Sequence, residues 1–128
     1  MKLLLDTHIL LWLAADMLPP SAEEHILDEA NEIFFSPASI WEVVIKKSLN
    51  RSDFEVDPSL LLSGLLDNGY EQIRITAHHV LMVGALPMHH KDPFDRILLA
   101  QSISEGVTLL TADRIMTKYP ASVILLKK

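Results

Sequence analysis

The chain has 128 residues, 49% of them hydrophobic and 22% charged, with 4 Gly, 7 Pro and no Cys. This composition predicts a single globular domain over residues 1–128 and excludes disordered and collagen-like chains. The absence of Cys also excludes a disulfide framework and a thiolate metal site. Lys and Arg number 11 against 17 Asp and Glu, a net charge of −6, so any binding of nucleic acid requires a local site.

The N-terminal residues look superficially like a signal peptide. Lys2 precedes an apolar stretch, but Asp6 and His8 interrupt it. The longest apolar run, Ile9–Ala15, is too short to span a bilayer. We therefore expect a cytoplasmic protein that does not associate with a membrane.

Short apolar runs alternate with longer stretches of helical period, a pattern typical of β-α units that build a parallel sheet in an α/β fold. In chain order, we predict a strand at Lys2–Leu5, a helix at Thr7–Ala15, a helix from Ser21 to about Ala30, a strand at Glu32–Phe35, helices starting at Pro37 and Pro58, a strand at Gln72–Ile75, a helix at Pro93–Glu105, a strand at Val107–Leu110, a helix at Arg114–Lys118 and a strand at Val123–Leu126.

Local signals mark where several helices begin and end. Three helix starts place a capping residue before a proline suited to the first helical position: Ser36-Pro37, Asp57-Pro58 and Asp92-Pro93. Ser21 and Glu24 have the spacing of a capping box. Three glycines follow apolar periodic segments and can adopt the left-handed conformation that ends a helix: Gly69, Gly84 and Gly106. The helix at Pro93–Glu105 is nearly apolar, so we expect it to be buried.

Acidic residues follow the predicted strands at the edge of the sheet where ligands of open α/β folds bind. Asp6 follows the first strand, Glu42 lies about one helical turn after the second, and Asp113 follows the fourth. A fourth acid, Asp95, opens the buried helix. It joins the others if the topology delivers the start of that helix to the same edge.

Helix capping is a competing explanation for these acids. Asp6, Asp92 and Asp113 would each cap the helix that follows. Glu42 would pair with Ser39 in a capping box. Ser, Asn or Thr serves equally well as a cap, whereas these positions hold carboxylates. Converging carboxylates repel one another and raise their own pKa values unless a cation lies among them, and hard oxygen donors suit Mg²⁺ or Mn²⁺.

Four sequence blocks carry a resemblance to a known family. In chain order they are Leu3-Leu4-Leu5-Asp6-Thr7-His8, Ser39-Ile40-Trp41-Glu42, His90-Lys91-Asp92-Pro93-Phe94-Asp95-Arg96 and Leu109-Leu110-Thr111-Ala112-Asp113. They resemble the motifs of PIN-domain proteins, and most of all those of the VapC toxins of bacterial type II toxin–antitoxin pairs. The Asp-Pro-Phe-Asp-Arg block is the most specific. Ala112 departs from the pattern, because many relatives carry a polar or basic residue there.

This resemblance implies a Mg²⁺- or Mn²⁺-dependent endoribonuclease that hydrolyses RNA phosphodiester bonds with metal-activated water. It also implies a three-layer α/β/α sandwich with a central, mostly parallel sheet of four to five strands, a homodimer, and a cognate VapB-like antitoxin. The acidic centre of the family falls on Asp6, Glu42, Asp95 and Asp113. We expect Asp6 and Asp95 to be the principal metal ligands.

Other residues are expected to support this centre. We predict that Thr7 and Thr111 hydrogen-bond the carboxylates and that Asp92 caps its helix and serves as an outer ligand. The candidates for phosphate contacts, each with surface charge or a salt bridge as the alternative, are Lys46, Lys47, Arg51, Lys91, Arg96 and Arg114. Glu42 and Lys46 also have the spacing of an intrahelical pair. The adjacent pairs His78-His79 and His89-His90 are expected to be ordinary surface or loop histidines, which makes a zinc hydrolase a minor option.

Two alternative functions stay open at this stage. One is a catalytically silent PIN-like module that binds other proteins, and the other is a metal-dependent nuclease or phosphatase acting on a substrate other than RNA. Several enzyme classes are disfavoured, because the sequence has no Gly-rich phosphate loop and no Gly-x-Ser-x-Gly elbow. His8 occupies the position where a haloacid-dehalogenase-like phosphatase carries its second Asp.

Overall fold

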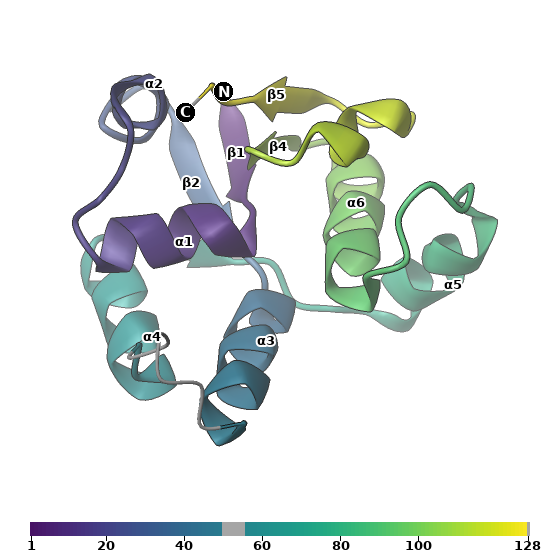
Figure 1. Cartoon of the computed structure of the whole chain (residues 1–128). Coiled ribbons are helices and arrows are strands. Elements are labelled where there is room, and N and C mark those ends of the chain that lie inside the picture. Colours follow the sequence, from purple (N-terminus) through teal and green to yellow (C-terminus); the bar gives the residue numbers. More distant parts are fainter. Residues whose placement is uncertain (50–55, 128) are drawn as a thin grey trace.

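Five parallel strands form one sheet in the order β3-β2-β1-β4-β5 (Figure 1). The computed structural model describes residues 1–49 and 56–127. Its strands are β1 (Lys2–Leu5), β2 (Glu32–Phe35), β3 (Glu71–Gln72), β4 (Thr108–Thr111) and β5 (Val123–Leu125). Because β1 lies at the centre and is covered on both faces, its last three residues, Leu3, Leu4 and Leu5, are all apolar and fully buried.

Helices cover both faces of the sheet, as the three-layer α/β/α prediction requires (Figure 1). The described helices are α1 (Thr7–Ala14), α2 (Pro20–Ile26), α3 (Pro37–Ser48), α4 (Pro58–Asp67), α5 (Ala77–Ala85), α6 (Pro93–Glu105) and the 3₁₀ helix η1 (Arg114–Lys118). Residues of α1 to α4 pack in the hydrophobic core on one face, and residues of α5, α6 and η1 pack in the core on the other. Within the described residues, every helix is too short or too polar to cross a bilayer.

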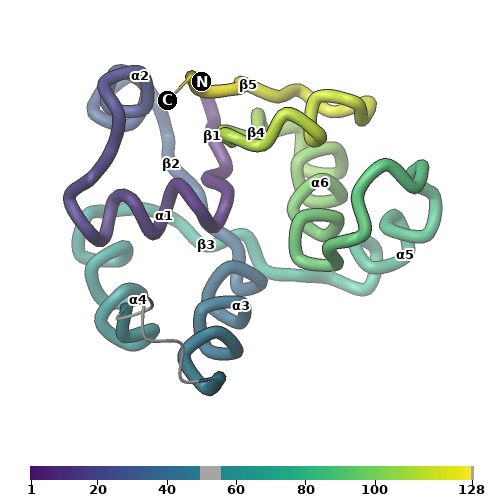
Figure 2. The backbone as a smooth tube through the Cα atoms, viewed as in Figure 1, coloured from purple at the N-terminus to yellow at the C-terminus, as the bar shows by residue number. Residues whose placement is uncertain are grey.

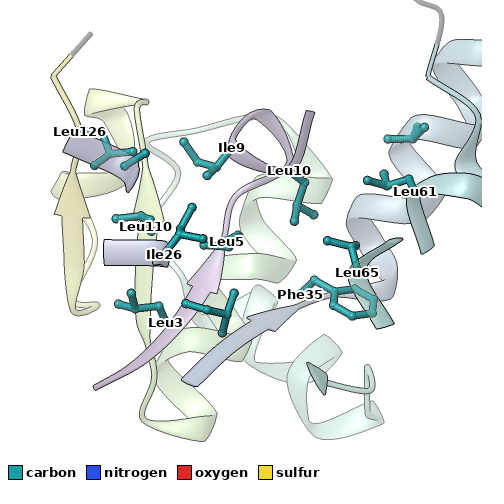
Figure 3. Close-up of a cluster of buried hydrophobic side chains, with 13 residues drawn as sticks. Leu3, Leu5, Ile9, Leu10, Ile26, Phe35, Leu61, Leu65, Leu110 and Leu126 are labelled. Carbon is teal, nitrogen blue, oxygen red and sulfur yellow. The ribbon is translucent and has the colours of Figure 1, made fainter. Parts of the chain in front are cut away.

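The alternation of side chains along β1 feeds both cores. Leu3 and Leu5 lie in the first core with Ile9 and Leu10 of α1, as the close-up shows (Figure 3). Leu4 lies in the second core. Side chains of successive strand residues point to opposite faces, so one short segment anchors two helical layers.

The order of the strands creates a crevice between β1 and β4. Residues of α1, which follows β1, pack in the first core, whereas η1, which follows β4, packs in the second core through Met116. In the backbone trace, α1 and the segment after β4 run in different directions (Figure 2). At such a switch point the two loops diverge beyond the carboxyl ends of neighbouring strands, and open α/β folds bind their ligands there.

The local signals located most elements correctly. Ser36, Asp57 and Asp92 all accept hydrogen bonds from the backbone at the starts of their helices, and α6 has the predicted bounds. Gly69 and Gly106 have φ of 80° and 67°, as predicted for left-handed helix ends.

Several details of the predicted elements were wrong. Gly84 lies inside α5 rather than at its end. The Ser21–Glu24 capping box is absent, because α2 begins at Pro20 and the Ser21 hydroxyl donates to Lys127 O instead. The second helix ends at Ile26, short of the predicted Ala30. The third strand lies at Glu71–Gln72, because its pairing with the end of β2 sets its position.

Candidate metal centre and active site

A cleft of about 340 Å³ lies beyond the carboxyl ends of β1 and β4. It brings together all four acids of the predicted centre: Asp6 and Asp113 follow the ends of β1 and β4, and Glu42 and Asp95 lie in α3 and α6. The residues that line it are Asp6, Thr7, His8, Leu11, Glu42, Lys46, Asp92, Asp95, Ala112 and Asp113. Acids that lie far apart in the sequence therefore share one site.

Hydrogen bonds and one aromatic contact bring the elements that carry the acids together. The Asp6 N–H donates to Leu110 O at 3.0 Å, which aligns the ends of β1 and β4. Asp92 Oδ1 accepts hydrogen bonds from the N–H groups of Phe94 and Asp95, which fixes the start of α6. The rings of Trp41 on α3 and Phe94 on α6 contact edge to face at 5.1 Å. The helices that carry Glu42 and Asp95 therefore lie side by side.

Asp6 does not use its side chain as a helix cap. It occupies the N-cap position of α1, but its carboxylate makes no capping hydrogen bond and instead accepts one of 2.5 Å from the Thr111 hydroxyl. Burial raises the pKa of Asp6, and this effect outweighs the opposing effect of the Thr111 hydrogen bond. The nearby charges of Glu42 and Asp113 raise this pKa further. Capping does not account for this carboxylate.

The surroundings of Asp95 also raise its pKa strongly. Burial is the largest cause, and together with the neighbouring charges of Asp6, Asp92, Glu42 and Asp113, in decreasing order, it raises the pKa of Asp95 to about 8. Without a cation, Asp95 is therefore largely protonated at neutral pH. A cation among these groups would stabilise the ionised form.

Glu42 carries an oxygen with no partner. Its Oε2 lies 3.2 Å from Lys46 Nζ, in the predicted intrahelical pair, whereas its Oε1 is buried without a hydrogen-bond partner. A buried acceptor that lacks a donor destabilises a protein by about 1–3 kcal/mol. The capping box predicted for Glu42 and Ser39 is absent, because Ser36 caps α3. An orphaned carboxylate oxygen beside further carboxylates fits a hard divalent cation.

Asp113 caps a helix and also lines the cleft. Its Oδ1 accepts a hydrogen bond from Ile115 N at the start of η1, so it is a helix cap. Its Oδ2 faces His90 Nε2 at 2.9 Å. Because each carboxylate oxygen has two lone pairs, these contacts leave capacity for a cation.

His90 belongs to this site, and the sequence analysis missed it. Its Nε2 also lies 2.9 Å from Asp95 Oδ2, and the three atoms lie within 4.8 Å of one another. The expectation of an ordinary surface or loop histidine was wrong here. It was also wrong for His79, which is 2% exposed, forms a capping box with Thr76 and contacts Glu105. The usable signal for His90 was its place at the head of the block that contains Asp92 and Asp95.

The two threonines differ in their contacts. Thr111 makes the predicted hydrogen bond to a carboxylate, that of Asp6. Thr7 does not, because its buried hydroxyl donates to Ser39 Oγ at 2.9 Å and links α1 to α3. Asp92 is the predicted helix cap and also lines the cleft.

The basic residues predicted as candidates for phosphate contacts differ in whether they line the cleft. Lys46 lines the cleft, whereas Lys47 pairs with Asp57 at 3.5 Å. Lys91 and Arg114 are exposed and do not line the cleft. Arg51 lies outside the described residues.

Arg96 is a correction to the sequence analysis. Its side chain is buried at 7% exposure, and its guanidinium donates to the carbonyls of Pro87 and Val83 at 3.0 and 2.9 Å. Further contacts reach Leu86 O, His90 O and the Tyr119 hydroxyl. A buried cation must satisfy its N–H groups, and here backbone carbonyls do so in place of a phosphate or a salt bridge.

Comparisons with known proteins identify the family and the fold of this chain. The model of the PIN domain family matches residues 3–121. VapBC2 from Rickettsia felis, bound to a DNA fragment from its promoter, has a similar fold, with a TM-score of 0.76, 20% identity, and coverage of 99% of this chain and 100% of the other. DNA-bound VapBC from Salmonella typhimurium matches with a TM-score of 0.69, 14% identity and coverage of 97% of each chain.

A third similar structure is VapBC-5 from Mycobacterium tuberculosis, a member of the VapBC family of toxin–antitoxin systems. Its TM-score is 0.65 at 16% identity, with coverage of 99% of this chain and 98% of the other. A comparison with curated proteins found no match. The match to the family model covers nearly the whole chain and includes every acid that lines the cleft. The chain belongs to the PIN domain family.

Proposed function

We propose that this chain is a divalent-metal-dependent endoribonuclease and the toxin component of a VapBC-type toxin–antitoxin pair. PIN domains are nucleases, and family membership supports a hydrolase. The observation that carries the proposal is the state of the acidic cleft. Asp95 has a pKa raised to about 8, and Glu42 Oε1 is buried without a hydrogen-bond partner; a divalent cation would stabilise both carboxylates in their ionised form.

The donor set favours Mg²⁺ or Mn²⁺. Asp6 and Asp95 would be the principal ligands, Glu42 would use its free Oε1, and Asp113 would complete the set. When bound, the cation supplies activation of water for attack on phosphorus and neutralises charge on the scissile phosphate. The chain itself orients Asp6 through Thr111 and keeps the carboxylates of Asp6, Glu42 and Asp95 largely buried.

Lys46 is the basic residue best placed to contact a phosphate. It lines the cleft beside Glu42, with 35% of its side chain exposed. A flexible ammonium at the mouth of an acidic cleft offsets part of the repulsion between the carboxylates and an RNA backbone. Binding of RNA and binding of the cation would therefore be coupled.

The proposed partners follow from the similar structures. Those from R. felis and S. typhimurium are VapBC complexes bound to DNA. We infer from this likeness a VapB-like antitoxin as partner, together with a homodimer and a cytoplasmic location for this chain. Purification from a host that also expresses the neighbouring short reading frame tests the antitoxin, and sedimentation of the purified chain tests the dimer.

The function is tested with three substrates and four proteins. Structured RNA, single-stranded DNA and a simple phosphate ester are incubated with the wild type, Asp6→Asn, Asp95→Asn and Asp57→Asn, in Mn²⁺, Mg²⁺ or EDTA. Asp57 is the matched control, because it caps α4 outside the acidic cleft. We expect RNA cleavage only with a divalent cation, its loss in Asp6→Asn and Asp95→Asn, and its retention in Asp57→Asn.

Each alternative function gives a different result. Preferential cleavage of DNA or of the phosphate ester would replace RNA as the substrate class. Cation binding without hydrolysis of any of the three would indicate a silent interaction module. Full cleavage by both site variants would show that the acids are wrongly assigned.

A further inference from the structure

We propose that His90 is a positioning residue, which holds the Asp95 and Asp113 carboxylates together by donating a hydrogen bond from Nε2–H and does not itself bind the cation. This inference rests on the proposed metal-dependent function. It assigns a role to a side chain that the acidic motif of the family does not include.

The imidazole ring joins two separate elements. Asp95 lies in the first turn of α6, and Asp113 follows β4. The Oδ2 atoms of both acids lie 2.9 Å from the same His90 Nε2. A single N–H shared between two acceptors draws together carboxylates that would otherwise repel each other.

The other ring nitrogen identifies Nε2 as the donor. The backbone N–H of Asp92 donates to His90 Nδ1 at 3.3 Å. A backbone N–H can only donate, so Nδ1 must present its lone pair, and the proton of the neutral ring lies on Nε2. A protonated nitrogen has no lone pair for a metal. The same contact that fixes the tautomer therefore favours a hydrogen-bond donor over a ligand.

A buried network keeps His90 in place. The Tyr119 hydroxyl accepts hydrogen bonds from the backbone N–H groups of His90 at 2.7 Å and His89 at 3.1 Å. The Arg96 guanidinium donates to His90 O and Pro87 O, and it also contacts the Tyr119 hydroxyl. Arg96 and Tyr119 are both buried. This network fixes the segment before α6, which gives the buried guanidinium a purpose other than phosphate binding.

The consequence is a preformed pair of ligands. Each Oδ2 can accept the shared N–H and still offer a lone pair. Removal of a group that hydrogen-bonds and orients a metal ligand typically lowers the metal affinity by about 10–100-fold. We therefore expect His90 to strengthen cation binding without contacting the cation.

The test compares His90→Gln, His90→Leu and the control His78→Leu, which alters an exposed histidine on α5. A Gln amide can place an N–H near the position of Nε2, whereas Leu has similar size and no donor. Mn²⁺ affinity is measured by calorimetry, and pulsed electron paramagnetic resonance detects nitrogen bound to Mn²⁺. Circular dichroism in EDTA confirms that each variant is folded.

We expect Mn²⁺ in the wild-type protein to show no directly bound nitrogen. His90→Leu should weaken Mn²⁺ binding by about 10–100-fold, and His90→Gln should restore most of the affinity. His78→Leu should leave it unchanged.

Three results would overturn the inference. A strong coupling to ¹⁴N in the wild type would make His90 a ligand, and wild-type affinity in His90→Leu would remove its role. In both cases the metal-dependent function would stand. If the wild type binds no Mn²⁺, the proposed function and this inference both fail. Should His90→Leu not fold, the nitrogen measurement on the wild type and the affinity of His90→Gln still decide between donor and ligand.

Discussion

The Thr111 hydroxyl donates a hydrogen bond of 2.5 Å to Asp6 Oδ2 and so joins the end of β4 to the residue that follows β1. The hydroxyl oxygen of Thr111 also accepts a hydrogen bond from the backbone N–H of Asp113 at 3.0 Å. Both side chains of the Thr111–Asp6 pair are buried. One hydroxyl therefore orients two acids at the crevice between neighbouring strands.

Replacement of Thr111 with Val tests this relationship. Val keeps the shape of the side chain but removes the donor, so we expect the free energy of unfolding to fall by about 1–3 kcal/mol. Divalent affinity should fall by about 10–100-fold, because Asp6 loses the group that orients it. Chemical denaturation and calorimetry measure the two effects. The control is Thr108→Val, on the same strand as Thr111, which removes only an exposed contact with Ser122. It should change neither the free energy of unfolding nor the divalent affinity by much. Wild-type affinity in Thr111→Val would contradict the assigned role.

The raised pKa of Asp95 predicts how stability changes with pH. Its pKa is raised from 3.8 to about 8 in the folded protein, so between these values the folded chain holds a proton that the unfolded chain has lost. The contribution of Asp95 to stability is therefore greatest below pH 3.8 and decreases as the pH rises towards about 8. In EDTA, the thermal unfolding midpoint should fall as the pH rises over this range. Asp95→Asn should reduce the slope of the midpoint against pH.

Addition of a divalent cation gives a second test of the protonation of Asp95. At neutral pH, Mn²⁺ binding should release a proton from Asp95, which calorimetry in buffers of different ionisation enthalpy detects. Asp57→Asn should retain both the slope and the proton release. Identical slopes for the wild type and Asp95→Asn would show that Asp95 does not titrate in this range.

If Glu42 binds a divalent cation as proposed, Lys46 should compete with that cation for its carboxylate. Because its Nζ lies 3.2 Å from Glu42 Oε2, Lys46→Met should leave divalent affinity unchanged or raise it. RNA affinity should fall, and the dependence of RNA binding on salt should weaken by about the slope expected for one phosphate contact. Fluorescence anisotropy with labelled RNA in EDTA and in Ca²⁺, at several salt concentrations, measures both quantities. Lys47→Met is the control, because Lys47 pairs with Asp57 instead. Equal RNA affinity in both variants would remove Lys46 from the binding site.

Arg96 and Arg114 should behave differently when replaced. Arg96→Met removes the guanidinium hydrogen bonds to Pro87 O and Val83 O, so we expect a loss of about 1–3 kcal/mol in the free energy of unfolding. Arg114 is exposed, and Arg114→Ala should change stability by less than about 0.5 kcal/mol. Urea denaturation measures both. A small effect of Arg96→Met on stability together with a large loss of RNA affinity would restore the phosphate-contact interpretation.

Local signals in the sequence determined most of the elements of this fold. The start of α6 was recognisable because Asp92 and Pro93 act on the backbone within a few residues, and its end because Gly106 alone supplies the left-handed conformation. The position of β3 was less predictable. It is short and pairs with the end of β2, so a contact between distant segments sets its bounds.

The sequence by itself also determined which acids lie at the ends of strands, because a carboxylate after an apolar run is visible in any β-α unit. Only the tertiary structure decided that Asp95 joins Asp6 and that His90 lies between Asp95 and Asp113. It also decided that Arg96 donates to the backbone and Thr7 to Ser39. The physical reason is that a side chain's partners depend on how helices and strands pack in three dimensions, and sequence spacing specifies directions only within one element.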